Sequence, residues 1–156
     1  MKVQIIKIML IALISAFAFA CDNDKEKEEQ KPEIKDGTFI GTIKVNENTP
    51  AFYEQHDVEI ITEIIGTSSL TIKILRIRFA EQMPVNIDIA VEGIELTETK
   101  DGYSLYGNDI VPTAMGIPFS DYTITEMNGI LTSESLEFSM ICGTFPVHYS
   151  GIMGGF

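Results

Sequence analysis

The sequence predicts an all-β protein, folded as an antiparallel up-and-down β-barrel of about eight strands. Two observations predict it. Short runs rich in β-branched and aromatic residues recur along the chain, and several of them alternate apolar with polar residues. Gly, Asn, Asp and Pro stand between these runs, where turns are expected. Strands that follow one another through short turns suit an up-and-down barrel or a sandwich, and we expect the barrel.

Four strands are predicted in the first half of the folded part. Residues 37–45 are rich in β-branched residues, and residues 57–65 carry apolar side chains at alternate positions. A helix over residues 51–65 fits less well, because its 3.6-residue period is patchy. Within residues 70–79 the apolar side changes from one face to the other, which predicts a bend or a bulge. Residues 85–96 alternate regularly.

The second half predicts a hairpin, a long loop and three further strands. Lys100-Asp101-Gly102 predicts a tight turn, so residues 96–99 and 103–106 should pair. Residues 107–120 contain two prolines and are predicted as a loop with at most one short strand. The remaining strands are predicted at residues 121–132, 136–142 and 145–153.

Residues 1–20 predict a lipoprotein signal peptide. Lys2 and Lys7 give a basic start, and residues 8–20 are uncharged and almost wholly apolar. This run is shorter than the roughly 20 residues that span a bilayer, and it ends in small residues just before Cys21, the order typical of a secretory signal. In a lipoprotein, the cysteine directly after the signal-peptide cleavage site carries the lipid, so Cys21 is expected to be the lipid-attachment residue. The alternatives are a membrane-spanning anchor and an ordinary signal that ends near a cysteine.

Residues 21–36 predict a disordered acidic linker, and residues 37–156 predict a single barrel domain. After Cys21 the linker holds seven acids, four lysines and one isolated apolar residue, Ile34. It cannot bury enough apolar surface to offset the entropy lost on ordering. Fully extended, the linker would reach about 50 Å from the anchor.

The folded part is strongly acidic. From Gly37 onward sixteen acids stand against five basic residues, a net charge of −11, and the whole chain carries −12. Nucleic acids and anionic lipid surfaces are bound by basic patches, so no nucleic acid is expected as a partner.

The sequence holds no motif for catalysis, a cofactor or a metal. His56 and His148 lack metal-ligand spacing, and the nucleophile-elbow, P-loop and zinc-protease patterns are missing. We therefore expect a non-enzymatic protein without cofactors. Cys142 has no disulfide partner once Cys21 carries lipid, and its apolar surroundings predict a buried core residue.

Several stretches resemble one known family. Ala18, three places before Cys21, and the acidic run after that cysteine are similar to the looser lipobox and the surface-export signal of Bacteroidetes lipoproteins. G-x-F-x-G-x-I-x-V at 37–45, G-I-L-x-x-x-x-L-E-F-S at 129–139 and F-P-V-H-Y-S-G at 145–151 resemble the calycin-like lipoproteins of Bacteroides and related bacteria. The resemblance implies a lipocalin-like barrel, anchored by lipid to the outer membrane and displayed on the cell surface. A position facing the periplasm is the alternative.

Two functions fit this picture. The first is a binding module that holds a small apolar or amphipathic ligand inside the barrel, since eight strands either fill with their own side chains or hold one small ligand. The candidate lining residues are Phe39, Ile43, Val58, Ile60, Ile72, Ile74, Arg76, Ile89, Val91, Phe138, Met140 and Tyr149. Arg76 and Arg78 would bind a carboxylate or phosphate at the barrel mouth, or would pair with an acid on a neighbouring strand. The second function is a structural or accessory protein of a surface complex, which acts through its outer surface and the 107–120 loop.

Overall fold

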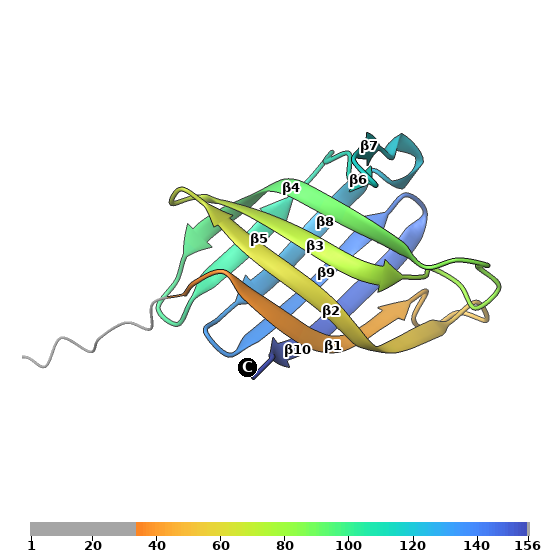
Figure 1. The fold of residues 1–156 in the computed structure, drawn as a ribbon, viewed down its shortest axis with the longest axis horizontal. Coiled ribbons are helices and arrows are strands. Elements are labelled where there is room, and N and C mark those ends of the chain that lie inside the picture. The colour runs from red at the N-terminus through yellow and green to blue at the C-terminus, as the bar shows by residue number, and fades with distance from the viewer. Residues whose placement is uncertain (1–33, 156) are drawn as a thin grey trace, which may run out of the picture. The chain divides into compact units, whose positions relative to one another are not determined.

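The structure is a computed structural model in which residues 34–155 are described. The predicted signal, Cys21 and the linker as far as residue 33 lie outside the described residues. The described residues belong to one compact unit, and it is built from strands (Figure 1). Its elements are β1 (Gly37–Val45), β2 (Tyr53–Ile65), β3 (Ser69–Ile77), β4 (Ile87–Glu98), β5 (Tyr103–Gly107), β6 (Thr113–Ala114), β7 (Ile117–Pro118), the 3-10 helix η1 (Ser120–Tyr122), β8 (Ile124–Leu131), β9 (Ser135–Cys142) and β10 (Phe145–Met153).

Eight of these strands close into an antiparallel up-and-down barrel, which confirms the predicted fold class. Around the ring the order is β1, β2, β3, β4, β5, β8, β9 and β10, each paired with the next. The pairing of β10 with β1 closes the ring, from Phe39 opposite Met153 to Val45 opposite Val147. Closure pairs each of these strands on both sides and removes the open edges of a flat sheet.

The hairpin of β6 and β7 branches from β4. Near its end β4 pairs with β5, where Glu98 lies opposite Tyr103, and near its start it pairs with β6, where Ile89 lies opposite Ala114. β5 pairs only with the last residues of β4, and β6 pairs with earlier residues of β4. The hairpin lies at the top of the barrel in Figure 1. The prediction of at most one short strand in residues 107–120 was wrong, because a tight turn joins two two-residue strands there.

Four β-bulges bend the barrel strands, and each has one residue with positive φ. The register shifts lie between Gly41 and Ile43, Leu70 and Ile72, Ile74 and Ile77, and Thr125 and Asn128. The corresponding positive-φ residues are Asp57, Gly93, Arg76 and Glu126. An extra residue on one strand lets apolar side chains keep facing inward while the strand bends. In β3 both Ile74 and Ile77 are buried, which confirms the predicted change of face.

The inward-facing side chains form one continuous core to which all eight barrel strands contribute. An aromatic cluster covers one end of this core. The ring centroids of Phe79 and Phe145 lie 5.3 Å apart, and those of Phe119 and Tyr122 lie 4.3 Å apart. Since Phe119 precedes η1 and Tyr122 is its last residue, the segment that follows the hairpin closes this end of the barrel.

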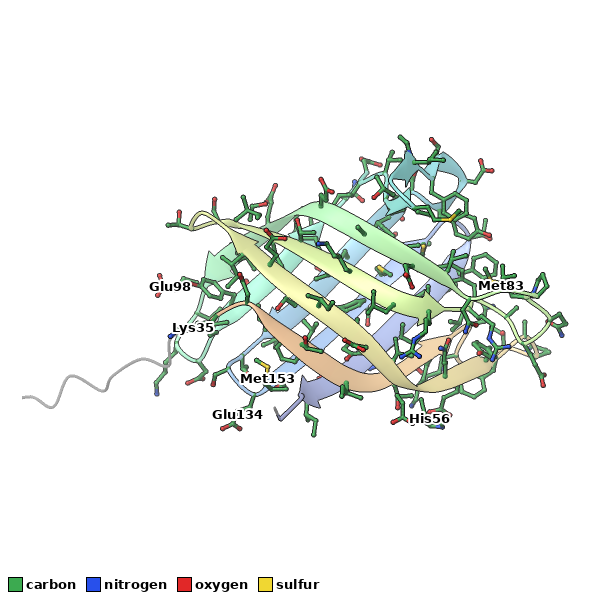
Figure 2. All side chains as sticks on the ribbon, viewed as in Figure 1. Lys35, His56, Met83, Glu98, Glu134 and Met153 are labelled. Carbon is green, nitrogen blue, oxygen red and sulfur yellow. The ribbon has the colours of Figure 1, made fainter. Side chains whose placement is uncertain are left out.

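The two ends of the barrel are distinct. Lys35 and Glu98 lie at one end, which we call the entry end, and Met83 lies at the opposite end (Figure 2). Ile34 packs against the core, and the Asp36 Oδ1 atom accepts a hydrogen bond from the Ile64 N–H at 2.7 Å. The last residues of the predicted linker therefore contact the barrel.

Candidate functional site

The predicted lining residues form the packed core of the barrel. Eleven of the twelve are at most 2% exposed: Phe39, Ile43, Val58, Ile60, Ile72, Ile74, Ile89, Val91, Phe138, Met140 and Tyr149. A chamber with room for water beside them would leave part of their surface accessible. These side chains therefore pack against one another in the interior of the described barrel.

Arg76 lies outside the barrel, so its predicted place in the lining was wrong. It is the extra residue of the β3 bulge, it has a φ of 55°, and it is exposed. Two side chains hold its backbone. The Asp88 Oδ1 atom accepts a hydrogen bond from the Arg76 N–H at 2.7 Å, and the Gln55 Nε2 atom donates one to its carbonyl oxygen at 2.8 Å.

Arg76 and Arg78 are the two arginines of the chain, and neither forms an ion pair with another residue in 34–155. The Arg78 guanidinium carbon lies 5.6 Å from the centre of the Tyr53 ring. Its Nε atom is buried without a hydrogen-bond partner. Arg76 is exposed and Arg78, just past the end of β3, is half-buried, so an arginine without an ion pair is unexpected at either position in a domain with sixteen acids.

A pocket of about 430 Å³ opens between the hairpin and the start of β4, and we call it the hairpin pocket. Its walls are formed by Arg76, Val85, Asn86, Ile87, Asp88, Ala114 and Met115. A smaller hollow of about 210 Å³ shares Asp88 and Met115 with it. Apolar side chains dominate the pocket walls, and Arg76 and Asp88 are their charged groups.

The tip of the hairpin is strained and apolar. Met115 and Gly116 have φ values of 51° and 76°, the pattern of a type I′ turn, for which Asn-Gly is the favoured sequence. A methionine in this left-handed conformation costs roughly 1–2 kcal/mol. Its side chain is 89% exposed, and Val85 and Ile117 are 59% and 65% exposed. We call Val85, Met115 and Ile117 the apolar patch.

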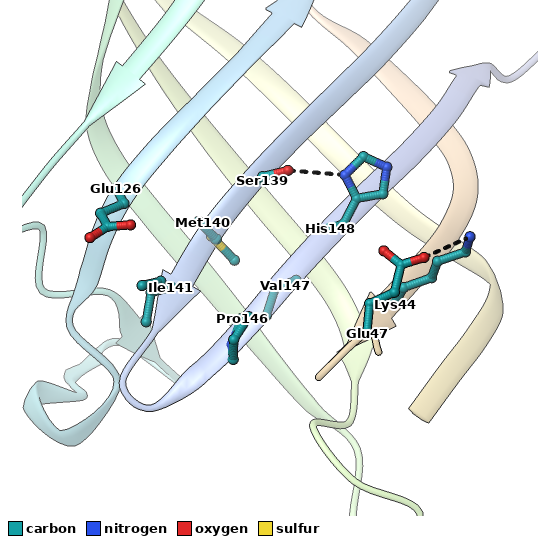
Figure 3. A pocket seen from close by; sticks show the side chains of 9 residues that line it. All are labelled: Lys44, Glu47, Glu126, Ser139, Met140, Ile141, Pro146, Val147 and His148. Atoms are coloured by element: carbon teal, nitrogen blue, oxygen red, sulfur yellow. Dashed lines mark hydrogen bonds and ion pairs between the residues drawn. The ribbon is translucent and has the colours of Figure 1, made fainter. Parts of the chain in front are cut away.

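A second surface hollow, of about 330 Å³, lies over β9 and β10 (Figure 3). In it the Ser139 Oγ atom lies 3.0 Å from the His148 Nδ1 atom, and outside it the Glu137 Oε1 atom lies 3.9 Å from the His148 Nε2 atom. Serine, histidine and an acid are the parts of a nucleophilic triad. However, β9 and β10 are each paired on both sides, so the sheet engages their N–H groups and leaves no preorganised oxyanion hole. Ser139 lies directly opposite His148, and we interpret the contact as a cross-strand pair.

Two core residues, Cys142 and Tyr149, have shifted pKa values. Burial raises the pKa of the Cys142 thiol to about 12 and also raises the pKa of Tyr149, so both groups stay neutral. Cys142 is free and buried, as predicted. Within residues 34–155, no three histidine, cysteine or acidic side chains gather in a way that could hold a metal ion.

No family model, no curated protein and no solved structure matches the chain. The class of the protein therefore follows from the fold and the site: a closed, side-chain-filled eight-stranded barrel with an apolar hairpin on its outside. Within residues 34–155, no helix is long and apolar enough to cross a bilayer.

Sequence reasoning found Arg76 and the 107–120 segment but not the pocket that brings them together. The pairing of β6 with β4 joins residues about 25 positions apart, and no local pattern marks it. A weak signal was present in Met115-Gly116, because a residue followed by glycine between two short runs is typical of a hairpin turn.

Proposed function

We propose that this protein is a lipid-anchored, non-enzymatic lipoprotein of the cell envelope, which binds a partner protein through the outside of its barrel. The observation that carries the proposal is the apolar patch. Its three side chains are each more than half exposed and lie on the hairpin and on the connection that precedes β4. Contiguous apolar side chains on a soluble surface mark an interaction site.

The hairpin presents the patch on a rigid support. β6 pairs with β4, and the Phe119 N–H donates a hydrogen bond to the Pro112 carbonyl oxygen at 2.8 Å. The Phe119 ring stacks on Tyr122, so the base of the hairpin is fixed to the aromatic cluster. A preformed surface loses little conformational entropy on binding, which favours affinity.

The acidity of the C-terminal part favours a basic partner, while the cations Lys73 and Arg76 line hollows that Met115 also lines. From Asp101 onward the chain has six acids and neither Lys nor Arg, and Asp109 and Asp121 flank the hairpin in sequence. We expect a partner with an apolar surface that is bordered by Lys and Arg. Such complementary charges accelerate association and make it sensitive to salt.

The lipid anchor on Cys21 places this surface at the outer membrane, most simply on the cell surface. The order of basic, apolar and small residues before the cysteine supports this part of the proposal. Palmitate labelling of the full chain should be lost in Cys21→Ala, and label that persists in this variant would contradict the anchor.

The binding surface is tested with paired variants of the full chain, cross-linked in the membranes of the cells that produce it. Met115→Asn keeps a residue suited to positive φ and removes the apolar tip, and Ile117→Asp places a charge beside it. Ile152→Asn is the control, because Ile152 is 69% exposed and lies on β10, on the far side of the ring from β4. We expect a specific cross-linked adduct with the native chain and with the control. Both hairpin variants should lose this adduct, and added salt should lower its yield. An adduct that survives both hairpin variants would overturn the proposed surface.

A further inference from the structure

We propose that the hairpin pocket binds a small amphipathic anion, a molecule with one carboxylate on an apolar body. This site shares Val85 and Met115 with the apolar patch and differs from it in its ligand and in its key residue, Arg76. The inference rests on three features of the pocket: a guanidinium without an ion pair, two lining residues with positive φ, and a mostly apolar wall of suitable size.

The guanidinium of Arg76 makes no ion pair with Asp88, the one acid that lines the pocket. Exposed ion pairs do form elsewhere on the barrel, at Lys44 with Glu47 and at Lys73 with Glu63. Asp88 lines the same pocket as Arg76, yet its Oδ1 atom accepts the backbone N–H of Arg76 and makes no ion pair with the side chain. The guanidinium donors are thus left for a carboxylate, which they can bind in a bidentate arrangement.

The backbone at the pocket is strained at two places. Among residues 34–155, positive φ occurs at three residues other than Gly, Asn and Asp, namely Arg76, Met115 and Glu126. Arg76 and Met115 line the hairpin pocket. Strained residues of this kind persist where the surrounding structure holds them, and they concentrate at binding sites. Asp88 and Gln55 hold Arg76 in this way, so the position from which its side chain projects is fixed.

The other residues that line the pocket determine the size and polarity of the ligand's body. A volume of about 430 Å³ lies within the range of small-molecule sites, which is roughly 300–1,000 Å³. Val85, Ile87, Ala114 and Met115 offer an apolar surface that an aliphatic or aromatic body would cover. Asp88 adds one negative charge, which disfavours a dianion such as phosphate and leaves a monovalent carboxylate as the matching group.

The test uses residues 31–156, the compact unit that contains every described strand and the hairpin pocket. Backbone amide shifts are followed by NMR during titration with decanoate, below its micelle concentration, and with decanol and acetate as probes of the tail and the charge. We expect decanoate to shift the amides of Arg76, Ile87 and Met115 saturably. Decanol and acetate should each bind at least about tenfold more weakly, since each lacks one of the two contributions.

Arg76→Asn separates the charge from the fold. Asparagine tolerates the left-handed conformation, so the bulge is retained while the cation is removed. Decanoate binding should weaken about tenfold or more in this variant and stay unchanged in Lys44→Asn, which removes an exposed cation outside the pocket. Shifts spread evenly over the barrel, equal affinity in Arg76→Asn, or equal affinity for decanol would overturn the proposal. Ile117→Asp tests the partner surface without touching the pocket wall, so failure of one proposal is distinguishable from failure of the other.

Discussion

The hydroxyl of Tyr149 on β10 lies 3.5 Å from the carbonyl oxygen of Val58 on β2, although β1 lies between these strands. Gly41 of β1 is paired with Gly151 on one side and with Val58 on the other. The tyrosine side chain passes under Gly151, where a Cβ atom would clash with its hydroxyl oxygen. Gly151 thus makes room for one of the largest buried side chains of the core, and Gly41 lets the backbone of β10 approach closely at Ser150.

Gly151→Ala should lower the free energy of unfolding by about 1–3 kcal/mol, because the added methyl group overlaps the Tyr149 side chain in a packed core. Urea unfolding measures the change. Gly155→Ala is the matched control, since nothing lies within 4 Å of the added carbon, and its effect should stay within about 0.5 kcal/mol. Equal midpoints for the two variants would refute this account of Gly151.

Tyr149→Phe should change the free energy of unfolding by less than about 1 kcal/mol. The hydrogen bond to Val58 is at the outer limit of length and is therefore weak. The free energy lost with it is nearly offset, because the variant no longer has a polar hydroxyl to bury. The ring, which supplies the packing against Phe138 at 5.4 Å between centroids, is retained. A loss of more than about 2 kcal/mol would show that the hydroxyl contributes more than its distance indicates.

Cys142 should react with thiol reagents only when the barrel opens. Its thiol is buried, and desolvation raises the pKa from 9.0 to about 12, so the reactive thiolate is scarce in the folded protein. The measurement uses the unit from Lys31, in which Cys142 is the single cysteine. At pH 8, its labelling rate should rise with urea in parallel with the unfolded fraction. Labelling at the rate of a free thiol in the absence of urea would contradict the burial.

The same thiol makes stability depend on pH. The unfolded chain loses the Cys142 proton near pH 9, whereas the folded chain keeps it until about pH 12. The free energy of unfolding should therefore be highest below pH 9 with respect to this group and should fall as the pH rises from 9 to 12. Cys142→Ala removes this contribution and should have a flatter profile in that window, although its core is less well packed.

Met115→Asn should stabilise the fold by roughly 0.5–1 kcal/mol, because asparagine adopts positive φ with less strain than methionine. Thermal unfolding measures the gain. Together with the loss of partner binding proposed above, this result would show that Met115 is retained for function at a cost in stability. A less stable variant would mean that the methionine side chain contributes to packing, despite its 89% exposure.

The barrel strands could be predicted because their signal is local. β1 begins and ends where its β-branched run does, and β10 follows the alternation of residues 145–153. The predicted hairpin turn at Lys100-Asp101-Gly102 is confirmed by the pairing of Glu98 with Tyr103. Turn residues and period-two patterns involve only a few neighbouring positions, so they can be recognised in the sequence without knowledge of the fold.

Features that depend on contacts between distant segments could not be predicted. Residues 53–56 extend β2 although they are mostly polar, because Tyr53, Glu54 and Gln55 pair with the end of β1 and Tyr53 packs against the core. The bulge at Arg76 turned a residue that alternation had placed inside the barrel to the outside. A sequence pattern shows that a strand changes face but does not say which residue is the extra one, and this one-residue ambiguity decides where the arginine lies.

Closure of the ring through β1 and β10 also brings the two ends of the described chain together. The Gly154 N–H donates a hydrogen bond to the Thr38 carbonyl oxygen at 2.8 Å. A short peptide could therefore splice these ends, and the chain could be cut instead in the connection between β2 and β3. Such a circular permutant would keep every barrel pairing and would carry new termini at the entry end, where a fluorophore or a surface-immobilisation tag would leave the hairpin uncovered.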